Sequence, residues 1–340
     1  AQIRRVFVTI FVPIVSDEDR DNDQDVDASA TESSSGAPFD DGFKRLAFEQ
    51  PLASGEEHGL SVDDAARTFF TFDCNPGGSD QKYAANQQIC RGFARARGVD
   101  IYDVNSGIGT HLAIDEGLVG PGGTMVSTDS HANILGAIGA FGQGMGDQDI
   151  ASAWAAGSVW FNVPKSMRVF IDGDPGPLAT PKDVVLALAK HFGASGLLGY
   201  SAEYYGDAAE SLSLDGRITV ASMATEMGGI ITFLPPSDEV IEHCRAAGAT
   251  NFTPAYADPD AEYGHEERVS IEGLGPMISR PGHPDDAVEV SEVAGRKIDS
   301  AFIGSCTNGR IEDLRIAAKI ARAVHAVVNH GDPYRPFFEG

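Results

Sequence analysis

Cysteine is scarce in this sequence of 340 residues, which contains only Cys74, Cys90, Cys244 and Cys306. Their wide, irregular spacing matches neither the framework of a disulfide-stapled secreted domain nor the paired cysteines of a zinc ribbon. The sequence therefore favours a reducing compartment, and we expect the protein in the cytoplasm.

Basic residues are also few: 25 Lys and Arg stand against 50 Asp and Glu, for a formal net charge of -25. Such an excess of negative charge argues against a basic surface that binds nucleic acid. It also means that an anionic substrate would need a local positive centre, such as a metal or a few arginines.

Long hydrophobic runs are missing, because no apolar stretch reaches the roughly 18 residues of a membrane span. Residues 6–15 are apolar, but Pro13 interrupts them and no convincing small-residue cleavage site follows, so we expect neither a membrane anchor nor a signal peptide. A hydrophobic content of 42% fits a globular protein, and the length predicts two or three domains.

The domain organisation is predicted from shifts in composition along the chain. Residues 16–41 are acidic, rich in serine and poor in large apolar residues, so we expect them to be disordered or to form a long loop. The predicted regions are a poorly structured N-terminal segment at 1–61, a first α/β domain at 62–178, a second at 179–297, and the start of a third, incomplete domain at 298–340.

Strand and helix patterns alternate after residue 62, which predicts an α/β fold with mainly parallel sheets around a ligand-binding cleft. The predicted strands are 67–72, 101–104, 124–127, 166–171, 200–205 and 298–303. The predicted helices are 80–97, 149–160, 181–192, 217–227 and 311–328. Thr180 and Pro181 provide an N-cap and a first helical residue for the third of these helices. In such sheets, ligands bind at the carboxyl ends of the strands.

Cys306 is the first candidate for chemistry, because it lies in a glycine-flanked turn between an apolar strand and a helix. A thiolate there can accept backbone N–H groups, and soft thiolates bind iron–sulfur clusters or zinc. The alternative is an inert, buried cysteine in a strand–helix turn.

Histidines and carboxylates also lie at three other predicted strands: His111 and the sequence Asp129-Ser130-His131 follow two of them, and Glu203 lies within the third, 200–205. A carboxylate beside a histidine fixes its tautomer and raises its basicity, so these residues could form two such pairs. Each histidine taken alone is more often structural.

Taken together, the motifs resemble those of the aconitase superfamily, and they occur in that family's order. They are GIGTH at 107–111, TDSH at 128–131 followed by GAIGAFGQGMG, TPKDVVLALA at 180–189, EYYG at 203–206, MATEMGG at 223–229 and SCTNGR at 305–310. Within the superfamily, IDSAFIGSCTNGRIEDLR and MISRPGHPDDAVEVSEVAG are similar to large subunits of the isopropylmalate dehydratase and homoaconitase branch.

This resemblance implies a hydro-lyase with a [4Fe–4S] cluster held by three cysteines, acting on a hydroxy di- or tricarboxylic acid. Cys306 matches the first cluster ligand, and the other two are expected beyond Gly340. The resemblance pairs His111 with Asp129 and His131 with Glu203. It also places Ser130 near a substrate carboxylate.

The resemblance further implies a separate small subunit carrying a swivelling domain and the proton-abstracting base. One departure concerns a catalytic Asp-His pair of the family. Asp73 matches the aspartate, but Cys74 stands where the histidine would be. Because two cluster cysteines are missing, the chain resembles a truncated subunit, and we expect it to be inactive alone.

Three functions are compatible with these residues. The first is the dehydratase of 3-isopropylmalate in leucine biosynthesis, with a small subunit as partner and neither nucleic acid nor membrane as ligand. The second is an aconitate hydratase, a homoaconitase or a related malate dehydratase. The third is a catalytically inactive aconitase-like scaffold or fragment.

Overall fold

The computed structural model describes residues 2–4, 7–10, 62–72, 81–297, 301 and 303–330. The chain divides into two compact units. The first comprises Ala1–Val119, Thr124–Ser130 and Gly144–Asn162, and the second comprises Gly120–Gly123, His131–Gln143 and Val163–Gly340. The predicted boundaries after residues 178 and 297 stay predictions, and the acidic segment at 16–41 lies outside the described residues.

The first unit alternates short strands with helices. Its elements are β1 (Gln2–Arg4), β2 (Phe7–Ile10), the 3-10 helix η3 (Ala65–Arg67), β3 (Thr68–Thr71), α3 (Gln81–Arg97), β4 (Asp100–Tyr102), α4 (Gly109–Asp115), β5 (Thr124–Ser127), α5 (Asp147–Ala156) and β7 (Ser158–Trp160). In the larger sheet of this unit β4, β3, β2 and β5 are neighbours in that order, and β6 (Phe141–Gly144) belongs mostly to the second unit. Its pairs β4–β3, β3–β2 and β2–β5 are parallel.

Aromatic side chains form the core of the first unit. The ring centroids of Phe70 and Trp154 are 5.4 Å apart, and Phe93 stacks on Trp154 at 5.2 Å. The guanidinium of Arg91 lies 4.7 Å from the centroid of the buried Phe72 ring. Because β3 contributes Phe70 while α3 and α5 contribute Phe93 and Trp154, this cluster attaches both helices to the sheet.

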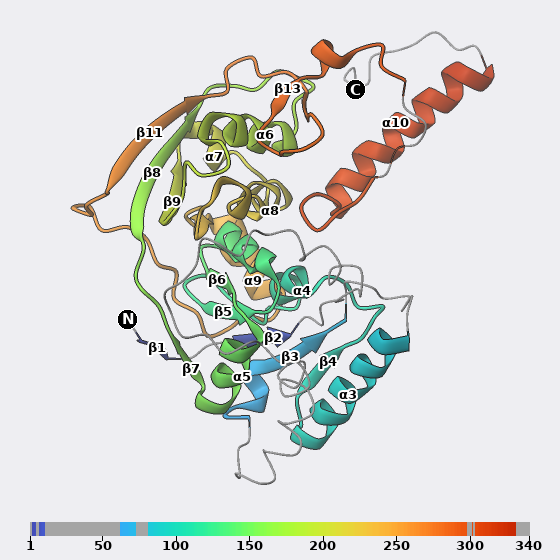
Figure 1. Ribbon diagram of the computed structural model, residues 1–340. Coiled ribbons are helices and arrows are strands. Elements are labelled where there is room, and N and C mark those ends of the chain that lie inside the picture. The colour runs from blue at the N-terminus through green and yellow to red at the C-terminus, as the bar shows by residue number, and fades with distance from the viewer. Residues whose placement is uncertain are drawn as a thin grey trace, which may run out of the picture. The chain divides into compact units, whose positions relative to one another are not determined.

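The second unit contains the longer strands. Its elements are η4 (Ser130–Ile138, which starts at the last residue of the preceding segment), β8 (Lys165–Asp172), α6 (Pro181–Phe192), β9 (Tyr200–Tyr205), α7 (Asp207–Glu210), α8 (Leu214–Ser222), η5 (Thr225–Met227), β10 (Ile231–Phe233), α9 (Asp238–Ala246), β11 (His265–Ser270), β12 (Met277–Ser279), β13 (Ala287–Glu289), η6 (Val290–Val293) and α10 (Ile311–His330). The strand order β10-β9-β8-β11 is parallel throughout. Figure 1 shows α6, α7 and α8 gathered beside this sheet.

Helix α6 begins with the predicted cap. The Asp183 carboxylate accepts hydrogen bonds from the Thr180 backbone N–H at 2.6 Å and from the Thr180 hydroxyl at 2.7 Å, which forms a capping box. The same carboxylate accepts the backbone N–H of Met277 at 2.6 Å. Asp183 therefore holds both the start of α6 and the strand β12.

The α/β fold class and its mainly parallel sheets are confirmed. Two helix predictions were too long. The helix predicted at 217–227 ends at Ser222, and residues 225–227 form the separate 3-10 helix η5. The helix predicted at 149–160 ends at Ala156, because Gly157 adopts a left-handed conformation (φ 60°) and caps the helix. Residues 158–160 form β7 instead. The predicted strand at 298–303 falls mostly outside the described residues. Among the described helices, none combines the length and the apolar character needed to span a bilayer.

Candidate functional site

Cys306 lies in the turn that precedes α10, and the sequence predicted a helix directly after this turn. Its Sγ atom is 3.8 Å from Nε2 of His131, within hydrogen-bonding distance for sulfur. Which of the two atoms carries the proton depends on the histidine tautomer. Both residues are half-buried and belong to the second unit. The structure thus brings together two of the predicted site residues.

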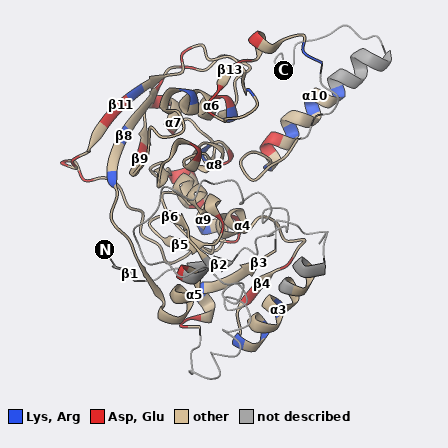
Figure 2. Cartoon of the chain, viewed as in Figure 1, with Lys and Arg blue, Asp and Glu red and all other residues tan. Residues whose placement is uncertain are grey.

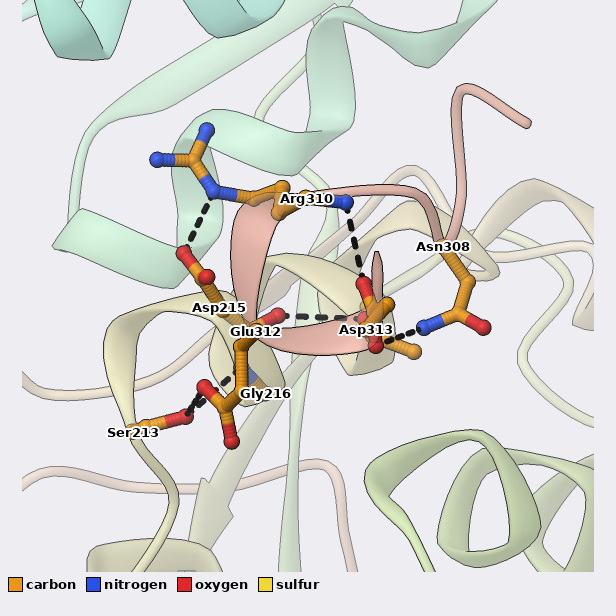
Figure 3. Close-up of polar contacts among 8 residues, drawn as sticks. Ser213, Asp215, Gly216, Asn308, Arg310, Glu312 and Asp313 are labelled. Carbon is orange, nitrogen blue, oxygen red and sulfur yellow. Dashed lines mark hydrogen bonds and ion pairs between the residues drawn. The ribbon is translucent and has the colours of Figure 1, made fainter. Parts of the chain in front are cut away.

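Hydrogen bonds within the turn fix its conformation. The Asn308 side chain donates to Asp313 Oδ1 at 2.6 Å, and the Arg310 backbone N–H donates to Asp313 Oδ2 at 3.0 Å (Figure 3). The backbone N–H of Asn308 donates to the Ser305 hydroxyl at 3.1 Å. Acidic residues in the first turn of α10 lie at the positive end of the helix dipole, which stabilises the start of this helix (Figure 2).

His131 is the second residue of the 3-10 helix η4, directly after Asp129 and Ser130, and the rest of this helix, residues 132–138, is buried. The Asp129 backbone N–H donates to the Ser127 hydroxyl at 3.0 Å, and Ser130 is exposed. Two residues beyond His131, the buried Asn133 side chain donates to the Ser222 carbonyl at the end of α8, at 3.5 Å. This contact attaches the His131 segment to α8.

His111 lies half-buried in α4 of the first unit. Helix α4 packs so closely on β3 that a Cβ atom at Gly109 would overlap the Thr71 side chain. The predicted pairing of His111 with Asp129 stays a prediction. Asp73 and Cys74 lie outside the described residues.

Glu203 lies on β9, and two tyrosines hold its carboxylate. Its Oε2 atom accepts hydrogen bonds from the Tyr263 hydroxyl at 2.6 Å and the Tyr205 hydroxyl at 2.9 Å. The guanidinium of Arg168 lies 3.8 Å from the centroid of the Tyr263 ring. Burial, followed by the hydrogen bonds with Tyr263 and Glu203, raises the pKa of Tyr205 strongly, so that this hydroxyl stays a donor. The predicted pairing of Glu203 with His131 stays a prediction.

A cavity of about 650 Å³ adjoins the Cys306 turn, because Thr307 forms part of its wall. Lys182, Met223 and Glu226 line it together with β12 and residues of the segment 280–284 that follows this strand. Glu203 instead lines a second cavity, of about 220 Å³, on which neither Lys182 nor Glu226 borders.

The Lys182 ammonium lies 3.3 Å from the Met223 sulfur, a weak acceptor. Burial lowers the pKa of Lys182, and the charges of Glu226, Cys306 and Asp183 oppose that shift. The sequence alone did not single out Lys182 or Glu226. Lys182 nevertheless lies in the family motif TPKDVVLALA, and Glu226 lies in MATEMGG.

The remaining described cysteines, Cys90 and Cys244, are both buried. Burial raises the pKa of Cys90 to about 12 and that of Cys244 to about 11, so both stay protonated at neutral pH. Within the described ranges, no group of three or more His, Cys, Asp and Glu side chains is placed to hold a metal. A cluster with several thiolate ligands therefore does not fit the described residues alone, which provide Cys306 as one candidate ligand.

Comparison with known proteins decides the family. The sequence profile of the aconitase family (aconitate hydratase) matches residues 77–297 and 291–334. The chain belongs to the aconitase family. This match covers most of both units' described residues and includes the motifs around His111, His131 and Cys306.

Within the aconitase family, the chain is similar to large subunits of two kinds of enzyme. The chain is 37% identical over 267 residues to the 3-isopropylmalate dehydratase large subunit 1 of Methanopyrus kandleri, covering 78% of this chain and 64% of the relative. It is 37% identical to the probable methanogen homoaconitase large subunit of Methanothermobacter thermautotrophicus, covering 78% and 62%. It is 36% identical to the 3-isopropylmalate dehydratase large subunit of Moorella thermoacetica, covering 80% and 66%. The match spans less than two thirds of these relatives' length.

Proposed function

We propose that this chain acts as the large subunit of a hydro-lyase that dehydrates and rehydrates a hydroxy di- or tricarboxylic acid, with 3-isopropylmalate as the first candidate substrate. The observation that carries the proposal is the 3.8 Å approach of Cys306 Sγ to His131 Nε2, which joins two separate family motifs. Membership of the aconitase family and the names of the relatives support the reaction type.

In this proposal Cys306 contributes one thiolate to a [4Fe–4S] cluster whose other ligands come from outside the described residues. Such a cluster, when bound, supplies Lewis acidity toward a substrate hydroxyl and carboxylate. In the same proposal His131, whose Nε2 lies 3.8 Å from Cys306 Sγ, donates a proton to the departing hydroxyl, which leaves as water. General acid–base assistance of this kind is typically worth about 10²–10⁴-fold in rate.

The other predicted roles are part of the same proposal. His111 with Asp129 forms one acid–base pair, Asp73 contributes a further carboxylate, and Ser130 binds a substrate carboxylate. A carboxylate orients His131. Glu203 is the residue that the motif match suggests, and Glu226 is the one that lines the cavity beside Thr307. Lys182 lines the same cavity and supplies positive charge for an anionic substrate in an acidic chain.

The proposed partner is a small subunit, because the relatives are named large subunits. A homoaconitase reaction is the second candidate, since a probable methanogen homoaconitase large subunit matches over the same share of this chain as the Methanopyrus protein. The cytoplasm is the proposed compartment.

A chimaera tests the proposed activity. Residues 77–334 of this chain would replace the matching segment of the Methanopyrus kandleri large subunit, and the product would be assayed anaerobically with that protein's small subunit. We expect hydration and dehydration of 3-isopropylmalate, and loss of both with Cys306→Ser. Cys244→Ser is the matched control, because Cys244 is buried in α9. A chimaera that folds, binds iron and sulfide, and turns over neither 3-isopropylmalate nor homocitrate contradicts the proposal.

A further inference from the structure

The Cys306 turn receives little support from apolar packing among the described residues. The apolar side chains of α10 that follow it are largely exposed, with exposed fractions of 59% for Ile311, 43% for Leu314 and 52% for Ile320. Hydrophobic burial normally fixes a helix on its domain. Because these side chains are exposed, the polar contacts among the described residues are the ones to consider for the position of the turn.

Two polar contacts join the start of α10 to the start of α8 (Figure 3). Arg310 Nε donates to Asp215 Oδ1 at 2.5 Å, and the Ser213 hydroxyl donates to Glu312 Oε2 at 2.8 Å. The side chains of Arg310 and Asp215 are each only 17% exposed. A charge-assisted hydrogen bond that is shielded from water is stronger and more directional than one at the surface.

Helix α8 is itself firmly held. Residues 216–222 are all buried, and Arg217 donates from Nη1 to the Pro235 carbonyl at 2.8 Å. The other end of α8 accepts the hydrogen bond from Asn133, two residues after His131. One short, buried helix therefore contacts the Cys306 turn at its N-terminal end and the His131 segment at its C-terminal end.

We propose that Asp215, which lies on α8, is a positioning residue. It acts through Arg310 to hold Cys306 beside His131. This inference rests on the proposed role of Cys306. Asp215 does not touch substrate or cluster in this scheme. Its function is to give the thiolate one defined position before any cluster or substrate arrives.

Alkylation of Cys306 in the native chain tests the inference without any activity assay. Peptide mapping gives the rate at which iodoacetamide modifies Cys306. The ratio of this rate in the native chain to the rate in denaturant reports how firmly the turn is held. We expect Asp215→Asn to raise this rate by about tenfold, because local opening of the turn becomes easier. The conservative Arg310→Lys keeps the charge but loses the guanidinium geometry, and should give an intermediate rate.

Asp103→Asn is the matched control, because it breaks another Arg–Asp pair, Arg91–Asp103, in the first unit. It should leave the Cys306 rate unchanged even if stability falls. An unchanged rate in Asp215→Asn, or an equal rise in Asp103→Asn, overturns the inference. If Asp215→Asn fails to fold, Arg310→Lys decides by the same criterion. Failure of the chimaera assay would leave the alkylation result intact, so the two proposals are tested separately.

Discussion

The Sγ atom of Cys306 and the Nε2 atom of His131 lie 3.8 Å apart, although 175 residues separate them in the chain. Cys306 is half-buried, whereas Cys90 and Cys244 are buried with raised pKa values. Cys306 is therefore the most accessible of the three described thiols, and the raised pKa values leave little thiolate at Cys90 and Cys244.

Native-state alkylation at pH 8 should accordingly modify Cys306 at least about tenfold faster than Cys90 or Cys244, since the thiolate is the reacting form. Mass spectrometry of the peptides gives each rate and follows Cys74 separately. All thiols should react alike in denaturant. Similar rates for Cys306 and Cys244 in the folded chain would contradict the described burial.

Glycine at position 136 is required by close packing. A Cβ atom there would overlap the backbone carbonyl of Thr232, which cannot move without disturbing β10. We expect Gly136→Ala to reduce the free energy of unfolding by about 1–3 kcal/mol, as overpacking does. Gly92→Ala is the control, because Gly92 lies in α3 with no atom within 4 Å of its added Cβ.

The control should be stabilising by about 0.5–1 kcal/mol, since alanine favours the helix. Denaturant unfolding monitored by circular dichroism measures both changes. Equal effects of the two substitutions would show that position 136 is not tightly packed.

The Arg91–Asp103 pair should make stability depend on pH. The hydrogen bond from Arg91 lowers the pKa of Asp103. The pair therefore stabilises the fold above the unfolded carboxyl pKa of about 3.9, and this contribution is lost as the pH falls through the lower, folded value. Because Asp103 is 44% exposed, we expect at most about 1 kcal/mol.

Unfolding of the wild type and of Asp103→Asn, compared between pH 7 and pH 2.5, measures this term. The difference in stability should be largest near neutral pH and should vanish at the acid end. A difference that stays constant over the whole range would rule out an electrostatic origin.

Glu203 and Glu226 are the two candidates for the carboxylate that orients His131, and substitution of each should have a different effect. Glu203 is held by two tyrosine hydroxyls, whereas Glu226 lines the cavity with Lys182 and Thr307. In the active chimaera we therefore expect Glu226→Gln to lower kcat by about 10²-fold or more. Glu203→Gln should chiefly lower thermal stability, because it weakens the bonds to the tyrosines. A larger loss of kcat with Glu203→Gln would instead support the pairing suggested by the motifs.

Local signals in the sequence predicted many of the elements. Thr180, Pro181 and Asp183 define the start of α6 through contacts within one helical turn, and Gly98 ends α3 with a positive φ of 67°. The end of α5 was missed because the helical pattern continues past Gly157, where a left-handed residue stops the helix. Burial patterns, caps and turns are encoded by neighbouring residues, and these can be read without a structure.

The site could be predicted only as a set of motifs. The sequence supplied Cys306 and His131 as separate candidates but not their distance, which depends on α8. The Arg310–Asp215 contact spans 95 residues, and the carboxylates at 203 and 226 cannot be ranked without knowing which cavity each one lines. Contacts of this kind depend on tertiary packing, which no local pattern specifies.

Asp183 also has a consequence for the order in which the second unit folds. Its bonds to Thr180 close a loop of three residues, whereas its bond to the Met277 N–H joins residues 94 positions apart. By loop-closure entropy the longer connection costs roughly 3 kcal/mol more. We therefore expect the cap to form early, with α6, and the same carboxylate to bind the backbone of β12 late in folding.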